Sequence, residues 1–193
     1  LPWTDFLTSY LGLKAEGEAD ESDRIRRIER KMAEADPALA GWTPLMGQLL
    51  GLPVPDNELT AVLDGQLRKQ RIFDITLTLV RHQALQSPLF IMVFEDVHWI
   101  DAISLELLNY IARNIARHRI LLIVLHRPTI ELTEWQKYEY CNRIALTDLP
   151  AGDAIRLMQL KLGTAEVPEA LKERVLHGGE RVNAFFLEEL LNS

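Results

Sequence analysis

The chain contains little cysteine, no long apolar run and no secretion signal. Cys141 is the single cysteine among 193 residues, so an internal disulfide is excluded. No apolar run reaches the roughly 20 residues of a membrane-spanning helix, and the first residues lack the charged-then-apolar pattern of a signal peptide. These absences predict a cytoplasmic location.

Basic residues are also comparatively few. Asp and Glu number 28 against 21 Lys and Arg, which gives a net charge of −7, and no dense basic stripe is present. Contact with nucleic acid by this segment is therefore not expected, because a phosphate backbone requires clustered positive charge. The 5 histidines and Cys141 lack the spacing of metal ligands, so a zinc site is not expected either.

Two catalytic signatures are absent as well. The sequence has no GxSxG, and Cys141 has no suitable histidine nearby in sequence, so a hydrolase with its own nucleophile has little support. It also has no GxxxxGK[ST], the loop whose backbone N–H groups and lysine cradle nucleotide phosphates. The 193 residues therefore lack the usual phosphate-binding element.

The most informative segment that is present covers residues 89–101, which read LFIMVFEDVHWID. Its continuous apolar run predicts a strand, Leu89–Phe94, buried on both faces of a parallel sheet. Unpaired charges cannot lie inside such a strand, so Glu95 and Asp96 mark its carboxyl end. Open α/β sheets bind their ligands at that end.

The segment begins a strand–helix–strand pattern. A helix over residues 104–117 and a second strand, Arg119–Leu125, complete a βαβ unit whose strands should be parallel and connected right-handedly. A helix over residues 131–139 and a short strand, Arg143–Leu146, extend the same layer. We therefore expect an α/β fold with a three-stranded parallel sheet, and 48% hydrophobic residues suffice for its core.

Helices are expected on both sides of this pattern, because apolar residues recur there at helical spacing. The stretches between them, 14–23 and 53–64, are poor in apolar residues and predict loops. Asp36 and Pro37 predict a capped helix start, and Gly51 with Pro53 predicts where that helix ends. The expected helices are Trp3–Leu13, Asp23–Ala35, 37–50, Gln66–Gln86, Asp153–Leu162, Pro168–His177 and Asn183–Leu191.

The string EDVHWIDAISLELL, from Glu95 to Leu108, resembles the Walker B region of STAND-class P-loop ATPases. This signal-transduction branch of the AAA+ relatives is found beside class III adenylate/guanylate cyclase domains and in large transcriptional regulators. Three further segments are similar to the same family: LPWTDFLTSYLGL, the HRP after the second strand, and VNAFFLEELLN near the end of the chain. The resemblance thus covers almost the whole chain.

The resemblance implies a partial P-loop NTPase-like sheet with many flanking helices and a C-terminal helical lid. Residues 1–149 would form a truncated ATPase core with a helical N-terminal half, and residues 150–193 would begin the lid. In the intact parent, which would use ATP and Mg²⁺, Glu95 and Asp96 would be the metal and catalytic residues. Glu95 would hold the Mg²⁺ shell, Asp96 would position or activate water, and Arg127 and Asn183 would contact the nucleotide.

Some positions depart from the family pattern. Leu125 and His126 stand where Thr and Tyr are usual, and Val182 and Ala184 stand where Gly and Pro are usual. The missing GxxxxGK[ST] predicts that the chain is a fragment without its P-loop segment, with no bound ATP or Mg²⁺ and no activity alone. Its partners would be that segment and adjacent signalling or output domains, and exposed strand edges predict gap closure or self-association.

Other roles for these residues remain open. Glu95 and Asp96 are equally the kind of pair that caps a helix or orders a loop, and Asp101 is better placed as a cap than as a ligand. His98 and Trp99 fit packing beneath the loop, and Arg127 fits an ordinary salt bridge. Phe185 and Phe186 are expected in a core. The alternative function is a nucleotide-independent scaffold that retains the ATPase-like fold.

Overall fold

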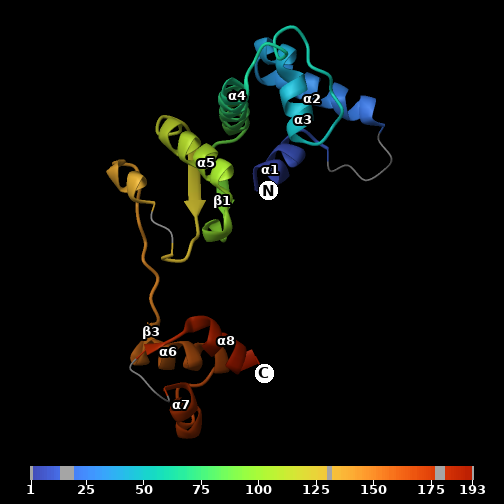
Figure 1. The fold of residues 1–193 in the computed structure, drawn as a ribbon. Helices are drawn as coiled ribbons and strands as arrows, with labels where there is room; N and C mark the ends of the chain where they lie inside the picture. Colours follow the sequence, from blue (N-terminus) through green and yellow to red (C-terminus); the bar gives the residue numbers. More distant parts are fainter. Residues whose placement is uncertain (1, 14–19, 130–131, 177–180, 193) are drawn as a thin grey trace. The chain divides into compact units, whose positions relative to one another are not determined.

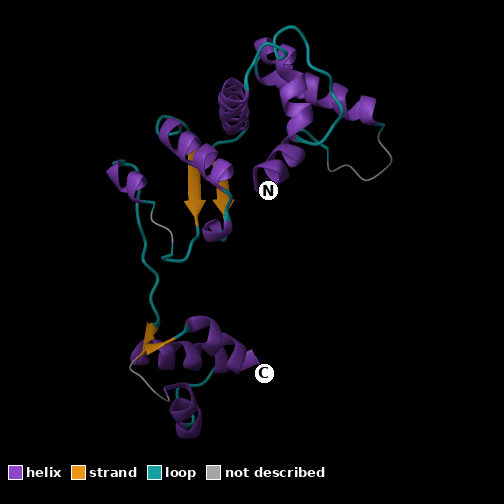
Figure 2. Cartoon of the chain, viewed as in Figure 1, coloured by secondary structure: helices purple, strands orange, loops and turns teal. Residues whose placement is uncertain are grey.

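The computed structural model describes residues 2–13, 20–129, 132–176 and 181–192 of the chain. Two compact units are formed, residues 1–141 and 142–193 (Figure 1). The fold is mixed α/β and mostly helical (Figure 2). The observed division follows Cys141, whereas the sequence placed the boundary after residue 149; the assignment of the two parts to an ATPase core and a lid stays a prediction.

The first unit contains the predicted strand–helix–strand pattern and the predicted N-terminal helices, with their ends shifted by a few residues. Residues 14–19 of the first expected loop and the expected helix start at Glu131 lie outside the described residues. In chain order the elements are α1 (Pro2–Tyr10), α2 (Glu21–Ala35), the 3₁₀ helix η1 (Pro37–Trp42), α3 (Thr43–Leu49), α4 (Gly65–Leu85), β1 (Phe90–Phe94), η2 (Val97–Trp99), α5 (Ala102–Asn114), β2 (Ile120–Val124) and η3 (Thr133–Lys137).

Local signals set the helix boundaries in this unit. The Asp36 side chain accepts a hydrogen bond from the Ala38 N–H at 2.9 Å, and Pro37 occupies the position after this cap. The expected single helix after Pro37 begins instead as η1 and continues as α3. Gly51 has φ +75°, a left-handed conformation that glycine adopts without steric cost, and it follows the end of α3.

Parallel pairing of β1 with β2 forms the sheet of the first unit. Phe90 lies opposite Ile120 and Phe94 opposite Val124, and α5 lies across one face of the pair (Figure 1). Side chains from α1, α4 and α5 pack against that face and bury it. The buried core residues are Trp3, Phe73, Leu77, Val80, Met92, Phe94, Val97, Leu107, Leu108, Ile111 and Ile115.

The prediction that β1 is buried on both faces is wrong. Ile91 and Val93 are each 51% exposed, and Leu121 and Ile123 of β2 are exposed beside them. The helices α4 and α5 cover only the face that carries Met92 and Phe94, and no described element packs on the other one. The first unit therefore has an apolar sheet face in contact with solvent.

The prediction of a third strand, Arg143–Leu146, is also wrong. Residues 142–148 have no regular secondary structure, and Ile144 and Leu146 are 81% and 86% exposed. A strand requires a ladder partner, and this segment pairs with nothing in the described chain. The expected helix over residues 131–139 is only the short η3 within the described residues.

A second hydrophobic core holds together the helices of the N-terminal half of the first unit. The helices α1 and α4 contribute to both cores: α4 turns Phe73, Leu77 and Val80 toward the sheet, whereas Ile75 and Leu79 face the helices. The long helix α4 therefore lies between the two cores and packs against both. The buried residues of the second core are Leu7, Leu11, Ile28, Met32, Leu39, Leu45, Met46, Leu52, Ile75 and Leu79.

The second unit is helical, as expected. It contains β3 (Leu149–Pro150), α6 (Ala151–Leu162), α7 (Glu169–Leu176), β4 (Arg181–Val182) and α8 (Ala184–Asn192), with β3 and β4 antiparallel. The expected helix end at His177 lies outside the described residues. Ala154, Met158, Val167, Val175, Val182 and Leu187 form its buried core.

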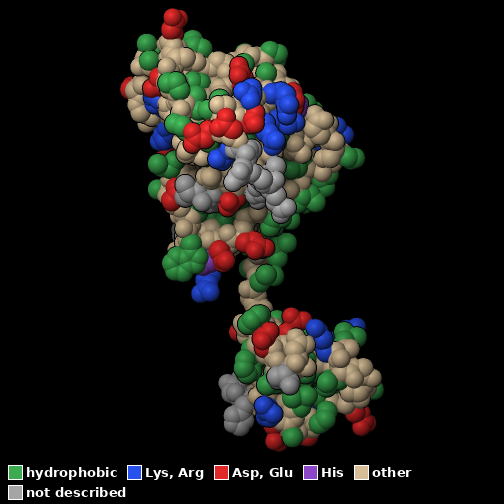
Figure 3. Space-filling view, turned by 90° about the vertical axis from the view of Figure 1, so that its right-hand side faces the viewer, with side chains coloured by type: hydrophobic (Ala, Val, Ile, Leu, Met, Phe, Trp, Pro, Cys, Tyr) green, Lys and Arg blue, Asp and Glu red, His purple; other side chains and the backbone are tan. Residues whose placement is uncertain are grey.

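Apolar side chains remain at the surface of both units, among charged ones (Figure 3). Phe185 and Phe186 of α8 are exposed, so the expectation that they belong to a core is wrong. They follow Asn183 in the first turn of α8, while Leu187 is the buried residue of that helix. No helix in the described ranges combines the length and apolarity that crossing a membrane requires.

Asp56 and Arg68 attach the loop over residues 53–64 to α4. Arg68 Nη2 lies 2.6 Å from Asp56 Oδ2, and the Thr60 hydroxyl donates to Asp56 Oδ1 at 2.8 Å. These hydrogen bonds, with a weaker one from Gln48, lower the pKa of Asp56 from its ordinary value to about 2. The carboxylate form is therefore the one that the folded chain prefers.

The substitution Asp56→Asn should lower the melting temperature at neutral pH. Because the folded-state pKa lies below the unfolded value of about 3.9, the stabilisation is complete above that value and is lost as the pH falls through about 2. The difference in melting temperature between the two proteins should therefore shrink below about pH 4. Glu58→Gln in the same loop is the control, and an Asp56→Asn difference that does not change with pH would contradict the assignment.

Candidate functional site

Glu95 and Asp96 form an exposed acidic turn directly after β1. Asp96 has φ 52° and ψ 36°, and among the described residues it is the one non-glycine with positive φ. Asp and Asn adopt this left-handed conformation more readily than other side chains, although it remains uncommon. The chain therefore turns sharply at the carboxyl end of the strand, where the sequence predicted the site.

Hydrogen bonds to β2 hold this turn in place. The Leu125 N–H donates to the Phe94 carbonyl at 2.8 Å, and the Val97 N–H donates to the Leu125 carbonyl at 3.1 Å. The Val97 side chain is buried in the core of the first unit. The two acidic residues thus lie between two anchored positions, Phe94 and Val97.

His98 is buried under the turn, whereas Trp99 is not. The His98 side chain is 5% exposed, its Nδ1 lies 3.9 Å from Asp96 Oδ1, and neither ring nitrogen has a hydrogen-bond partner in the described chain. Trp99 is 81% exposed, and its ring lies 5.2 Å from the imidazole, centroid to centroid. The packing role considered for both residues is therefore found for His98 and is wrong for Trp99.

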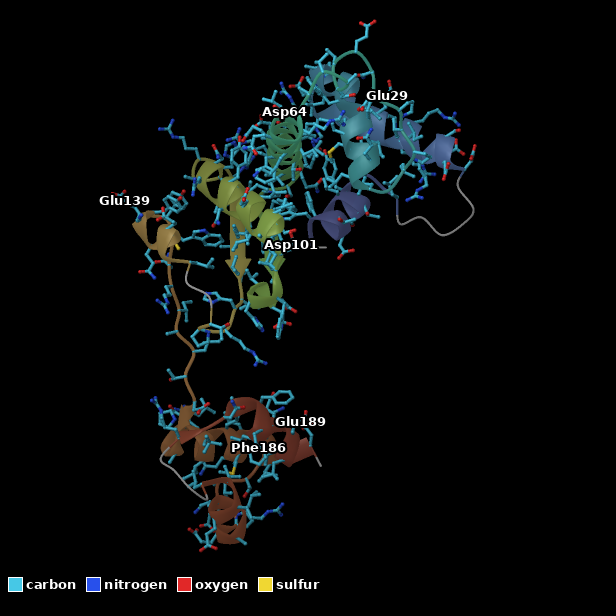
Figure 4. All side chains as sticks on the ribbon, viewed as in Figure 1. Glu29, Asp64, Asp101, Glu139, Phe186 and Glu189 are labelled. Atoms are coloured by element: carbon cyan, nitrogen blue, oxygen red, sulfur yellow. The ribbon has the colours of Figure 1, made fainter. Side chains whose placement is uncertain are left out.

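Asp101 caps α5, as the sequence suggested. Its Oδ1 accepts a hydrogen bond from the Ser104 N–H at 2.9 Å, and it lies at the start of the helix (Figure 4). Hydrogen bonds from the Ser104 side chain and then from its backbone lower the pKa of the Asp101 carboxyl. Asp101 thus fixes the helix that follows the acidic turn and is not a free ligand.

Arg127 and Asn183 lie in different units. Arg127 follows β2, so its backbone leaves the sheet at the same end as Glu95 and Asp96, and its side chain is exposed without an ion pair to any described residue. Asn183 accepts a hydrogen bond from the Phe186 N–H at 3.2 Å and so caps α8 in the second unit. The nucleotide contacts assigned to both residues stay predictions.

The side chains at the turn suit a hard cation that needs few protein ligands. Glu95 and Asp96 supply exposed carboxylate oxygens, and Mg²⁺ is commonly held by one or two carboxylates while it keeps several waters. In the described part of the chain, no group of three or more His, Cys, Asp or Glu side chains forms a complete metal cage. The donor set therefore fits Mg²⁺ shared with a ligand better than a structural metal.

Comparisons with known proteins found one distant relative and no family. The chain is 35% identical over 103 residues to the uncharacterized protein R02095 of Rhizobium meliloti (strain 1021), which is 52% of this chain and 10% of that protein. The alignment thus spans about a tenth of the relative's length. No family model and no solved structure matches the chain.

A groove lies beside β1 that the sequence did not predict. Asp5 and Ser9 of α1 line it together with the β1 residues Phe90–Phe94 and the following Glu95. The available signal was the polar pair Asp5 and Ser9, four residues apart on the exposed side of α1. That spacing indicates a polar helix face, but the identity of the opposite wall depends on contacts between residues distant in sequence.

Removal of the Asp101 cap should destabilise the first unit. Asp101→Ala leaves the Ser104 N–H without its acceptor, and we expect a loss of about 1 kcal/mol in the free energy of unfolding, measured by chemical denaturation. Asp101→Asn retains a side-chain oxygen and should lose much less. Equal losses in the two variants would argue against the capping role.

Proposed function

We propose that this chain is part of an ATP-binding and ATP-hydrolysing switch module of the STAND type within a multidomain signalling protein. The main support is the acidic turn: Glu95 and Asp96 are adjacent and exposed at the carboxyl end of a parallel β-strand pair. Ligands of open α/β sheets bind at that end. The similarity of EDVHWIDAISLELL to Walker B sequences supports the same assignment.

Within this proposal each side chain has a defined task. A bound Mg²⁺ would neutralise charge on the nucleotide phosphates. Glu95 would hold the waters and oxygens around the ion, and Asp96, set at a sharp turn, would orient the attacking water. Arg127, at the same end of the sheet, would contact the terminal phosphate.

The nucleotide requires a further element. No GxxxxGK[ST] occurs in the 193 residues, so the backbone and lysine that cradle phosphates would come from a separate segment. We therefore expect no MgATP hydrolysis by these residues alone and weak metal affinity at the acidic turn. Signalling and output domains of the longer protein would be the other partners.

A nucleotide-independent scaffold is the second candidate. The bare apolar face of the sheet favours it, because such a face suits protein contacts without any chemistry. Leu125 and His126 also lack the threonine hydroxyl that the family offers to water or phosphate. The encoding gene distinguishes the candidates: a GxxxxGK[ST] after an apolar strand supports the ATPase, and its absence supports the scaffold.

Manganese titration of the chain tests the acidic turn directly. Mn²⁺, which replaces Mg²⁺ at carboxylate sites, should broaden the backbone amide signals of Glu95, Asp96 and Val97 before others. Asp96→Asn should reduce this broadening, and Glu58→Gln, which removes an exposed acid elsewhere, should not. Broadening that begins at unrelated acidic residues would contradict a metal site at this turn.

In a protein that contains these residues together with a phosphate-binding loop, Glu95→Gln and Asp96→Asn should each lower turnover. A reduction of about 10²- to 10⁴-fold is typical when a positioned acid or base is lost. Nucleotide affinity, measured by calorimetry, should change little, because the phosphate loop provides most of it. Unchanged turnover in both variants would eliminate the assigned roles, whereas Glu58→Gln serves as the neutral reference.

A further inference from the structure

One edge of β1 has unpaired backbone groups. The Phe90 N–H donates to the Arg119 carbonyl at 2.9 Å, and the Phe94 carbonyl accepts from the Leu125 N–H at 2.8 Å, so both residues direct their peptide groups toward β2. Along a strand these directions alternate. The N–H and C=O groups of Ile91 and Val93 therefore point away from β2, and no other described strand pairs with that edge.

A groove follows this edge and has α1 as its second wall. Phe6 and Trp3 of α1 pack against β1, with ring centroids 6.4 Å from Phe90 and 4.9 Å from Phe94 respectively. These contacts hold the helix alongside the whole strand. The groove between them has a volume of about 640 Å³ and contacts every residue from Phe90 to Glu95. Its size and length suit an extended segment of a few residues.

The charged residues of the groove have one sign. Asp5 on α1 and Glu95 just after β1 line it, and none of the Lys, Arg and His residues that the structure describes does. Neither carboxylate has an ion-pair partner in the described part of the chain. A second copy of this chain, which has a net charge of −7, would bring the same carboxylates together, so like-charge repulsion opposes pairing between copies.

The groove continues into the bare apolar face of the sheet. Ile91 lies opposite Leu121 and Val93 opposite Ile123, so their side chains form one exposed aliphatic surface. A strand added at the β1 edge would extend this surface with its own alternate side chains. Aliphatic residues at those positions, with basic residues between them, complement both the surface and the carboxylates of the groove.

We propose that the β1 edge and α1 form a docking groove for an extended basic-aliphatic segment from outside these 193 residues. The segment pairs with the N–H and C=O groups of Ile91 and Val93 and adds a third strand to the sheet. Its basic side chains face Asp5 and Glu95. This binding requires neither a nucleotide nor a metal, but it shares Glu95 with the proposed metal site.

A short synthetic peptide of alternating valine and lysine is the probe. Fluorescence anisotropy of the labelled peptide should give saturable binding to the whole chain, and amide signals of Ile91, Val93 and Ser9 should shift in NMR spectra. The same peptide with a central proline, which lacks one N–H and interrupts the strand, should bind at least about tenfold more weakly. A valine–glutamate peptide should also bind more weakly, and equal binding of all three would overturn the proposal.

Substitutions from both walls localise the binding. Ser9→Trp fills the groove from α1 without altering β1 and should abolish binding, whereas Ser9→Ala is its control. Val93→Pro removes an outward N–H while the bonds to β2 remain, and circular dichroism would verify its fold. Asp5→Lys should weaken the lysine peptide several-fold and strengthen the glutamate peptide.

Two other results would overturn the proposal. Binding that Ser9→Trp leaves unchanged would place the peptide elsewhere. Self-association that shifts the Ile91 and Val93 amides, without peptide and in proportion to protein concentration, would identify a second copy of the chain as the occupant. Sedimentation velocity at several concentrations measures that association.

Discussion

The parallel pairing of β1 with β2 is the constraint on which the candidate site depends. The ladder sets the register, and its last bonds join Phe94, Leu125 and Val97 at the carboxyl end. Glu95 and Asp96 are the two residues between Phe94 and Val97. Both carboxylates are therefore held at the carboxyl end of the strands. The same pairing also determines which backbone groups of β1 remain free for another strand.

The helices α1 and α4 connect the sheet to the helical half of the first unit, because both contribute side chains to the two cores. Trp3 of α1 packs on Phe94 and donates from Nε1 to the Ser104 carbonyl at 3.0 Å, so it touches both the strand and the start of α5. Asp101 caps that same helix. The acidic turn is thus supported by a strand, a capped helix and a buried indole, and the helical half is attached to the site through shared side chains.

Local chemistry explains what the sequence could predict and where it could not. Asp36, Asp101 and Gly51 act on neighbouring residues, so the caps and helix ends could be recognised from their order in the chain. The strand expected at Arg143–Leu146 and the second covered face of β1 depend on partners distant in sequence, and both expectations were wrong. The left-handed turn at Asp96 had no recognisable signal either, because an aspartate most often adopts other conformations.

The left-handed backbone at Asp96 limits which residues can replace it. Asparagine and glycine enter this region at low cost, whereas a β-branched residue such as valine would clash with its own carbonyl group. Substitution of Asp96 by every other residue would therefore separate two requirements. Stability would report which residues tolerate the left-handed backbone, and metal binding would report which residues supply a negative charge.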